Sequence, residues 1–408
     1  MVPGAGWKGL RLVMTASAAL LLLLLPGCWD RKEVNDLAII MAAGLDKAEG
    51  GLVKLSVQLF VPRVSGGGGQ DSGGSGGGGK TPASGQTILR SATGNTLADA
   101  MTKLQEKLSR RIFWGHGEVF VFGEALAREG IRENIDFIMR DPGPRERAEM
   151  FICKGRAQDI LTLLPPLERS SAESLREMAK SQTGLKVTVK DFAEMLVSDA
   201  GAAALPWIET LPAQPGSDPK RTDAYINGSV ILKKDRMVGF IDDRVTRGLL
   251  WLRDEVEAAT VTLAPKEGKG LISFKILDSR TKLLPLIEGD RWSVTVRIQT
   301  EDDVIQNTTN INLVDPKVTE SLEKQLSAEI EKRIRVALVH PQKELHADIF
   351  NFAEAFRRRY PQLWKKEKQR WEERFPQVEV RIESRARIVR TGMATVQATR
   401  PKNEVKPK

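Results

Sequence analysis

The sequence predicts an α+β protein with more than one domain, a mixed arrangement in which antiparallel sheets pack against helices. Short segments in which apolar and polar residues alternate, typical of half-buried strands, occur in both halves of the chain. Stretches with apolar residues three or four positions apart, typical of helices, lie between and after them. With 408 residues, the chain is long enough for two or three hydrophobic cores.

The first half of the chain is expected to mix strands and helices. Thr96 and Asp99 have the spacing of a capping box, with Asp in place of the usual Glu. Helical stripes are formed by Leu97, Met101, Leu104 and Leu108, and by Ile131, Ile135 and Ile138. Expected strands are residues 37–45, 52–61, 118–122 and 148–153, and further helices are residues 156–164, 171–183 and 189–198.

A change in composition marks the second half, and we place a domain boundary there on the prolines Pro206, Pro212, Pro215 and Pro219. Residues 226–232 and 237–241 alternate as the two arms of a hairpin, and further strands are expected at residues 272–276, 292–298 and 378–388. Asp315-Pro316 is a strong helix start, because Asp caps and Pro tolerates the first position. The stripe that follows consists of Val318, Leu322, Leu326, Ile330, Ile334 and Leu338, and His340-Pro341 is expected to end it.

The first residues resemble an export signal with three parts. Lys8 and Arg11 give a positive start, and residues 12–25 form an apolar run that is short for a membrane-spanning helix. Leu25-Pro26-Gly27-Cys28 then resembles the bacterial lipobox. In that pattern the cysteine thiol receives diacylglycerol and its amino group an acyl chain, so we expect lipidation at Cys28. A cleaved signal with an incidental cysteine, or an uncleaved anchor, are the alternatives.

We therefore expect a signal peptide at residues 1–27 and an N-terminal domain at residues 28–200. A middle domain or linker with the hairpin is expected at residues 201–260, and a C-terminal α+β domain at residues 261–393. Ten of the residues between 66 and 79 are glycine, a composition that predicts a flexible surface loop. Residues 394–408 are expected to form a disordered tail.

Composition excludes a disordered chain and a polytopic membrane protein, since hydrophobic residues make up 41% and charged residues 28%. The formal net charge of +9 suits a protein held near an anionic membrane surface or an acidic polymer. Nucleic-acid binding is the competing interpretation, and the export signal argues against it.

The residues do not suggest an enzyme or a cofactor site. The sequence lacks the His-Glu-x-x-His and Cys-x-x-Cys patterns, and three histidines leave little material for a metal centre. His116 stands without a nearby cysteine or second histidine, so a packing or backbone-bonding role is favoured over catalysis. Cys153 lies in an apolar run and is expected to be a buried thiol.

Residues 356–375 combine basic and aromatic side chains, among them Trp364 and Trp371. Such a segment can contact a membrane surface or nucleic acid. The favoured alternative is that the aromatic rings pack on the strands while the basic groups face water, because Glu367, Glu372 and Glu373 interrupt the positive face.

A series of short motifs runs along the whole chain, beginning with Gly27-Cys28-Trp29-Asp30-x-x-Glu33. The others are Arg111 with Gly115-His116, Gly123-Glu124, Gly130-Ile131, Arg140-Asp141, Gly228 to Asp235, Val238-Gly239-Phe240, Asp348-Ile349-Phe350, Tyr360-Pro361-x-x-Trp364, Trp371-x-x-x-Phe375-Pro376, and Arg387 to Gly392. In this order the motifs resemble those of the Ger(x)C family, the C subunits of spore germinant receptors.

This resemblance implies a non-catalytic lipoprotein subunit on the outer face of the cell membrane or the spore inner membrane. Its implied partners are the membrane-embedded A subunit and the transporter-like B subunit, with ligand recognition largely in the latter. Trp29, Asp30 and Glu33 are candidate partner contacts. Two other classes stay open: a transporter's substrate-binding lipoprotein, expected to show two doubly wound lobes, and a cell-wall hydrolase, expected to need an acid/base pair or a metal cluster.

Overall fold

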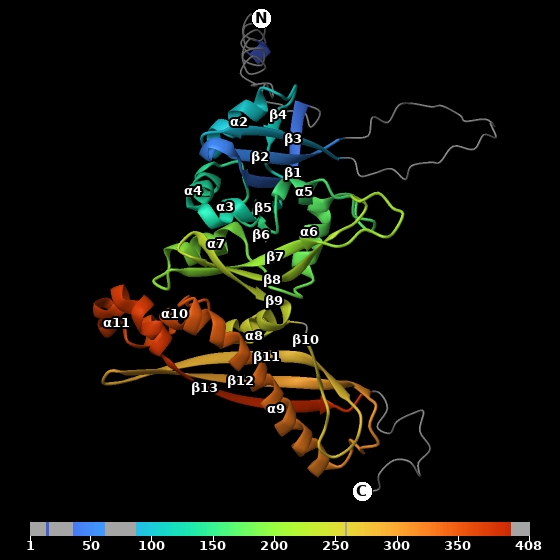
Figure 1. Cartoon of the computed structure of the whole chain (residues 1–408), viewed down its shortest axis with the longest axis vertical. Coiled ribbons are helices and arrows are strands. Elements are labelled where there is room, and N and C mark those ends of the chain that lie inside the picture. The colour runs from blue at the N-terminus through green and yellow to red at the C-terminus, as the bar shows by residue number, and fades with distance from the viewer. Residues whose placement is uncertain (1–13, 16–35, 62–86, 258, 393–408) are drawn as a thin grey trace, which may run out of the picture.

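The computed structural model describes residues 14–15, 36–61, 87–257 and 259–392. The chain folds around two β-sheets that follow one another along the long axis of the molecule (Figure 1). The larger sheet lies on the N-terminal side and the smaller sheet on the C-terminal side. This arrangement of helices and sheets confirms the predicted fold class. Of the helices that the structure describes, none combines the length and apolar content needed to cross a membrane.

The larger sheet has nine strands in the order β3-β2-β1-β5-β6-β7-β8-β9, with β4 beside β1. Its centre is parallel, because β1, β5, β6 and β7 run in one direction, and its flanking pairs are antiparallel. The bounds are β1 Leu37–Lys47, β2 Val53–Phe60, β3 Thr87–Gly94, β4 Arg111–Phe113, β5 Val119–Gly123, β6 Glu149–Cys153, β7 Ala202–Thr210, β8 Ala224–Lys233 and β9 Arg236–Asp242.

Helices cover both faces of this sheet. On one face α5 (Ala157–Leu161) and α6 (Ser171–Lys180) pack on residues such as Val121 and Phe151. On the other, Phe120 and Phe122 share a core with α2 (Leu97–Gln105), α3 (Glu124–Glu129), α4 (Arg132–Arg140) and α7 (Val189–Val197). Strands buried on both faces are apolar throughout, as in β5, because every side chain meets a covering helix.

The boundary expected near residue 200 falls inside the nine-stranded sheet. β7 pairs with β6, and β8 and β9 extend the sheet beyond it, so residues 202–242 do not form a middle domain with a sheet of its own. Of the prolines at which the boundary was placed, Pro206 lies within β7, and Pro212, Pro215 and Pro219 lie in the loop before β8. The predicted hairpin itself is present, with Lys233 opposite Arg236.

The smaller sheet has four strands in the order β10-β11-β12-β13. They are β10 Ala259–Leu263, β11 Ile272–Glu288, β12 Arg291–Asn307 and β13 Glu379–Arg390. β10, β11 and β12 are antiparallel as expected, but β13 runs parallel to β12. The intervening helices return the chain to the same end of the sheet, which makes the last pairing parallel.

Helix α9 (Pro316–Val339) crosses one face of the smaller sheet diagonally (Figure 1). It starts where the sequence predicted, with Asp315 Oδ1 accepting the Lys317 N–H at 2.9 Å. The apolar stripe is buried from Leu322 to Leu338, and a π-helical turn, His340–Glu344, continues the helix beyond the expected end. The remaining helices are α8 Asp243–Arg253, α10 Phe352–Arg359, α11 Pro361–Glu367 and α12 Trp371–Arg374.

Helix α2 begins at the predicted cap. The Thr96 hydroxyl accepts the Asp99 N–H at 3.2 Å, but the Asp99 carboxylate reaches back to the Asn95 N–H at 2.8 Å instead of to that of Thr96. A reciprocal capping box is present at α7, between Thr188 and Asp191.

Candidate functional site: the seam between the two sheets

The two halves of the chain are joined by side chains from helices α10 to α12. Trp364 in α11 donates its indole N–H to Asp199 Oδ2 at 2.8 Å, and Lys368 Nζ lies 3.3 Å from Asp199 Oδ1. Lys233, at the end of β8, forms an ion pair with Glu372 in α12. We call these contacts the seam, since they connect the turn after α7 and the β8–β9 hairpin to the C-terminal helices.

A buried carboxylate organises the helices on the C-terminal side of the seam. Asp348 accepts the backbone N–H groups of Phe350, Phe352 and Ala353 at 3.1, 3.2 and 2.7 Å, and so caps α10. Its Oδ2 also accepts the indole N–H of Trp371 at 3.1 Å. Burial raises the pKa of the Asp348 carboxyl, and these donors oppose the shift. The motif that contains Asp348 and the motif that begins at Trp371 are therefore joined by one hydrogen bond.

Aromatic rings fill the space behind this carboxylate. Trp371 lies 5.1 Å from Trp364 and 5.6 Å from Phe356 between ring centroids, and Trp292 of β12 lies 4.7 Å from Phe356. Most basic side chains of the same segment are exposed, among them Arg359, Lys365 and Lys366. The exception is Arg374, which is 15% exposed and lies over the Trp292 ring. The favoured interpretation of residues 356–375 is thus confirmed except at Arg374: the rings pack, and the other basic groups face water.

A polar cleft of about 850 Å³ opens along the seam, between α7, the end of α8 and α10. Acidic side chains outnumber basic ones in its lining. Among its basic side chains, Arg253 is 9% exposed, and its Nε donates to Glu255 Oε1 at 2.7 Å. On α10 the Glu354 carboxylate is paired with Arg357 and Arg358. These charged groups bind one another and give the cleft a polar lining.

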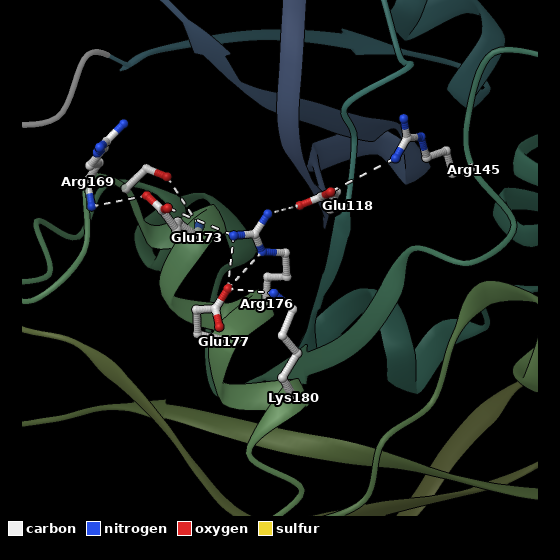
Figure 2. A network of polar contacts seen from close by, with 8 residues as sticks. Glu118, Arg145, Arg169, Glu173, Arg176, Glu177 and Lys180 are labelled. Atoms are coloured by element: carbon white, nitrogen blue, oxygen red, sulfur yellow. Dashed lines mark hydrogen bonds and ion pairs between the residues drawn. The ribbon is translucent and has the colours of Figure 1, made fainter.

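A second polar network lies away from the seam, on the side of the larger sheet where α6 packs. Figure 2 shows Arg176 of α6 reaching toward Glu118, the residue directly before β5, with Nη1 2.7 Å from Oε2. Arg145 approaches the same carboxylate at 3.9 Å, and Glu177 lies 2.9 Å from Arg176 Nη2. The bond to Glu118 raises the pKa of the Arg176 guanidinium. These ion pairs tie α6 to the strand that follows the Gly-His-Gly motif.

Gly123, another motif residue, is required by a buried cap. The Asp46 carboxylate accepts the N–H groups of Ala157 and Gln158 at 2.7 and 2.9 Å, which caps α5 from β1. A Cβ at Gly123 would lie 2.2 Å from Asp46 Oδ1. Any larger residue at Gly123 would displace this carboxylate.

The other candidate residues do not form a reactive site. His116 is exposed, and its ring meets that of Phe113 edge-on at 6.3 Å, so the packing role is a surface contact. Cys153 is buried as predicted, and burial raises the pKa of its thiol well above the ordinary value. Within the described ranges, no group of histidine, cysteine or carboxylate side chains is arranged to hold a metal ion.

The glycine-rich segment contains a pattern that needs a separate test. Residues 74–81 fit the Gly-x-x-x-x-Gly-Lys-Thr spacing of a phosphate-binding loop. They lie outside the described residues, and the next described element is the strand β3, which begins at Thr87. The spacing follows from the glycine repeat itself.

The lipidation site Cys28 and the candidate contacts Trp29, Asp30 and Glu33 lie outside the described residues. The seam residue Asp199, by contrast, was missed by the sequence analysis. It lies in a short polar turn, and nothing in its neighbours signals a partner 165 positions away. Arg176 had a weak signal, because acidic residues occur three positions before it and directly after it.

Comparison with known proteins first gives the class. The crystal structure of the GerBC protein matches this fold with a TM-score of 0.54 at 19% identity, covering 85% of this chain and 96% of that chain. Residues 30–210 match the spore germination protein N-terminal domain, and residues 227–392 match the spore germination B3/GerAC-like C-terminal domain. This chain therefore belongs to the Ger(x)C family of spore germination proteins.

Two relatives from Bacillus subtilis (strain 168) extend over nearly the whole chain. Spore germination protein KC is 28% identical over 392 residues, covering 91% of this chain and 93% of its own length. Putative spore germination protein YfkR is 29% identical over 366 residues, covering 89% of this chain and 92% of its own length. The predicted family is confirmed, and the likeness spans both sheets.

Proposed function

We propose that this chain is a lipid-anchored, non-catalytic subunit of a nutrient germinant receptor, acting through contacts with the membrane-embedded A and B subunits. The observation that carries the proposal is the family match over residues 30–210 and 227–392. The relatives are spore germination proteins by name. Contacts of motif residues support it further, because Trp371 binds Asp348 and Trp364 binds Asp199 across the seam.

The anchor proposal rests on Cys28 and the lipobox before it. Two or more acyl chains hold a protein at a membrane, since each buried CH₂ contributes about 0.8 kcal/mol. Such an anchor confines the chain to the plane of its partners and raises its effective concentration beside them. Trp29, Asp30 and Glu33 follow directly after the anchor and are the proposed contacts.

Replacement of Cys28 tests the anchor. Cys28→Ala should release the protein from spore membranes and reduce nutrient-triggered germination, while germination by agents that bypass the receptor stays normal. Cys153→Ala is the matched control, because it removes the buried cysteine of β6 and leaves the anchor in place. Mass spectrometry of the native protein should find a lipid on Cys28 and residues 1–27 removed. An unmodified Met1 N-terminus would contradict the anchor.

Deletion tests the receptor role itself. Spores without this chain should respond poorly to nutrients, in a strain with no second copy to compensate. A variant with Ala at Trp29, Asp30 and Glu33 should remain in the membrane fraction and yet lose much of the response. Unchanged nutrient responses after complete deletion would contradict the proposed function.

A further inference from the structure

The smaller sheet has one face free of helices in the described part of the chain. Side chains at Trp292, Val294, Val296 and Ile298 of β12 are buried beneath the C-terminal helices. Their neighbours at alternate positions, such as Arg297 and Gln299, are exposed on the opposite face. We refer to this second surface as the outer sheet face.

Positive charge is concentrated at the centre of the outer sheet face. Three successive rungs across β11, β12 and β13 carry five basic side chains and one acidic side chain. The rungs are Arg280, Gln299 and Arg385; Lys282, Arg297 and Glu383; and Leu284, Thr295 and Arg381. Neighbouring positions lie about 5 Å apart between strands and about 7 Å apart along them, so the charges form a compact patch. We name this patch of Arg280, Lys282, Arg297, Arg381 and Arg385 the basic patch.

The surrounding carboxylates neutralise only part of this charge. Arg297 is 3.1 Å from Glu383, and Arg280 is 3.2 Å from Asp278. Lys282, Arg381 and Arg385 are exposed and make no ion pair with any residue that the structure describes. Three cationic side chains of one flat surface thus remain free to bind an anionic partner.

A hollow of about 710 Å³ lies beside the basic patch. Its charged lining is balanced, because Arg280, Arg385 and Arg387 face Asp278, Glu301 and Glu323. Arg387 is 72% exposed, and its contact with Glu301 is long, at 3.8 Å. The excess of positive charge therefore lies on the rungs of the sheet and not in this hollow.

Apolar side chains lie on the same face, beside the charges. Leu284 and Leu286 point outward from β11 and are 38% and 45% exposed. They follow Lys282 along the strand, toward the tip of the β11–β12 hairpin. Basic groups beside exposed leucines are the combination by which a protein surface attaches to the interface of an anionic bilayer.

We propose that the outer sheet face docks on an anionic lipid bilayer and acts as a second membrane attachment. Its charge complements anionic headgroups, and its leucines reach the boundary of the acyl chains. An anchor near the N-terminus and a basic surface reinforce each other. Once one of them is attached to the bilayer, the other is held at a high effective concentration beside it. The proposal uses the anchor at Cys28 only for this synergy, and the patch can be tested without it.

The test uses the chain from residue 28 onward with Cys28→Ser, which cannot be acylated at that position. It should sediment with phosphatidylglycerol vesicles and not with phosphatidylcholine vesicles, and added salt should release it. The triple variant Lys282→Thr, Arg381→Thr and Arg385→Thr removes only the free charges and keeps strand-compatible residues. It should bind the anionic vesicles about 100-fold more weakly, since each basic group near such a surface contributes about fivefold.

A matched triple variant gives the control. Arg359→Gln, Lys365→Gln and Lys366→Gln removes three exposed bases from α10 and α11 and should leave vesicle binding unchanged. Circular dichroism and urea unfolding of both triples show whether each has folded. The proposal is overturned if the parent protein ignores anionic vesicles, if the strand triple binds as tightly as the parent, or if the helix triple loses binding instead.

Discussion

The two sheets differ in how many of their faces are covered by helices, and the residue patterns of their strands reflect this difference. In the larger sheet helices pack on both faces, and β5 and β6 consist almost entirely of apolar residues. In the smaller sheet α9 and the C-terminal helices cover one face, and β12 alternates between buried and exposed positions. Continuous apolar runs therefore report a sheet buried on both sides, whereas alternation reports a surface left open for contact.

The largest expected effect on stability compares a helix-covered face of the larger sheet with the outer sheet face of the smaller sheet. Phe151 of β6 is buried against α6, and Phe151→Ala should lower the free energy of unfolding by about 3–5 kcal/mol. Thr295 of β12 lies on the outer sheet face, and Thr295→Ala should change it by less than about 0.5 kcal/mol. Equilibrium urea unfolding measures both. A loss of several kcal/mol at Thr295 would show that this face is packed.

A smaller effect comes from a carboxyl group enclosed in the smaller sheet. Asp302 of β12 is fully buried, and burial raises its pKa from 3.8 to about 6. Its Oδ2 accepts the Thr300 hydroxyl at 2.8 Å, while Oδ1 has no hydrogen-bond partner among the described residues. The charged form is therefore poorly solvated. The Thr300 hydroxyl and the Arg387 backbone N–H oppose this shift only in part. The larger sheet has its own buried carboxylate, Asp46, whose pKa is also raised by burial, and there two backbone N–H groups oppose the shift.

This difference predicts a dependence on pH. The folded pKa of Asp302 lies above the unfolded value, so the folded state keeps a proton that the unfolded state has lost. The resulting stability is fully present below about pH 4 and is lost as the pH rises through about 6. Asp302→Asn should remove this component, up to about 3 kcal/mol. Urea unfolding of both proteins between these pH values measures the difference. Parallel stability curves would contradict the buried acid.

The fold could be predicted where each segment carries its own pattern. The alternation of apolar and polar residues predicted β12, and the apolar stripe from Leu322 to Leu338 predicted α9. Both patterns arise because the element is buried on one side only. The parallel pairing of β13 and the extension of the larger sheet by β7 to β9 could not be predicted. Both depend on which strand lies alongside, and no local pattern specifies that neighbour.

The candidate site was predictable only in part, for the same reason. The motifs around Asp348 and Trp371 were visible in the sequence, but the hydrogen bond between them joins helices that pattern analysis treats separately. Asp199 has no local signal, because its partner Trp364 belongs to the other half of the chain. The basic patch was likewise hidden, since its charges come from three strands and become neighbours only through the register.

The smallest effect concerns the edge of the smaller sheet at β13, beside which no further strand lies in the described part of the chain. Three side chains of α9 bind its backbone N–H groups instead. Glu323, Ser327 and Glu331 accept from Ile388, Ala386 and Ser384 at 2.8, 2.9 and 3.2 Å. Four helical residues rise about 6 Å and two strand residues about 6.7 Å, so one side chain per turn can meet every second N–H.

Removing the middle contact should weaken this protected edge by a modest amount. Ser327→Ala leaves the N–H of the buried Ala386 without its acceptor and should cost about 1–2 kcal/mol. Lys324→Ala on the exposed side of α9 is the control, since its ion pair with Glu320 is worth a few tenths of a kcal/mol. Hydrogen exchange should quicken at Ala386 in the first variant and not in the second. Equal exchange in both would mean that β13 is held by β12 alone, and that helices cover the face of this sheet without protecting its edge.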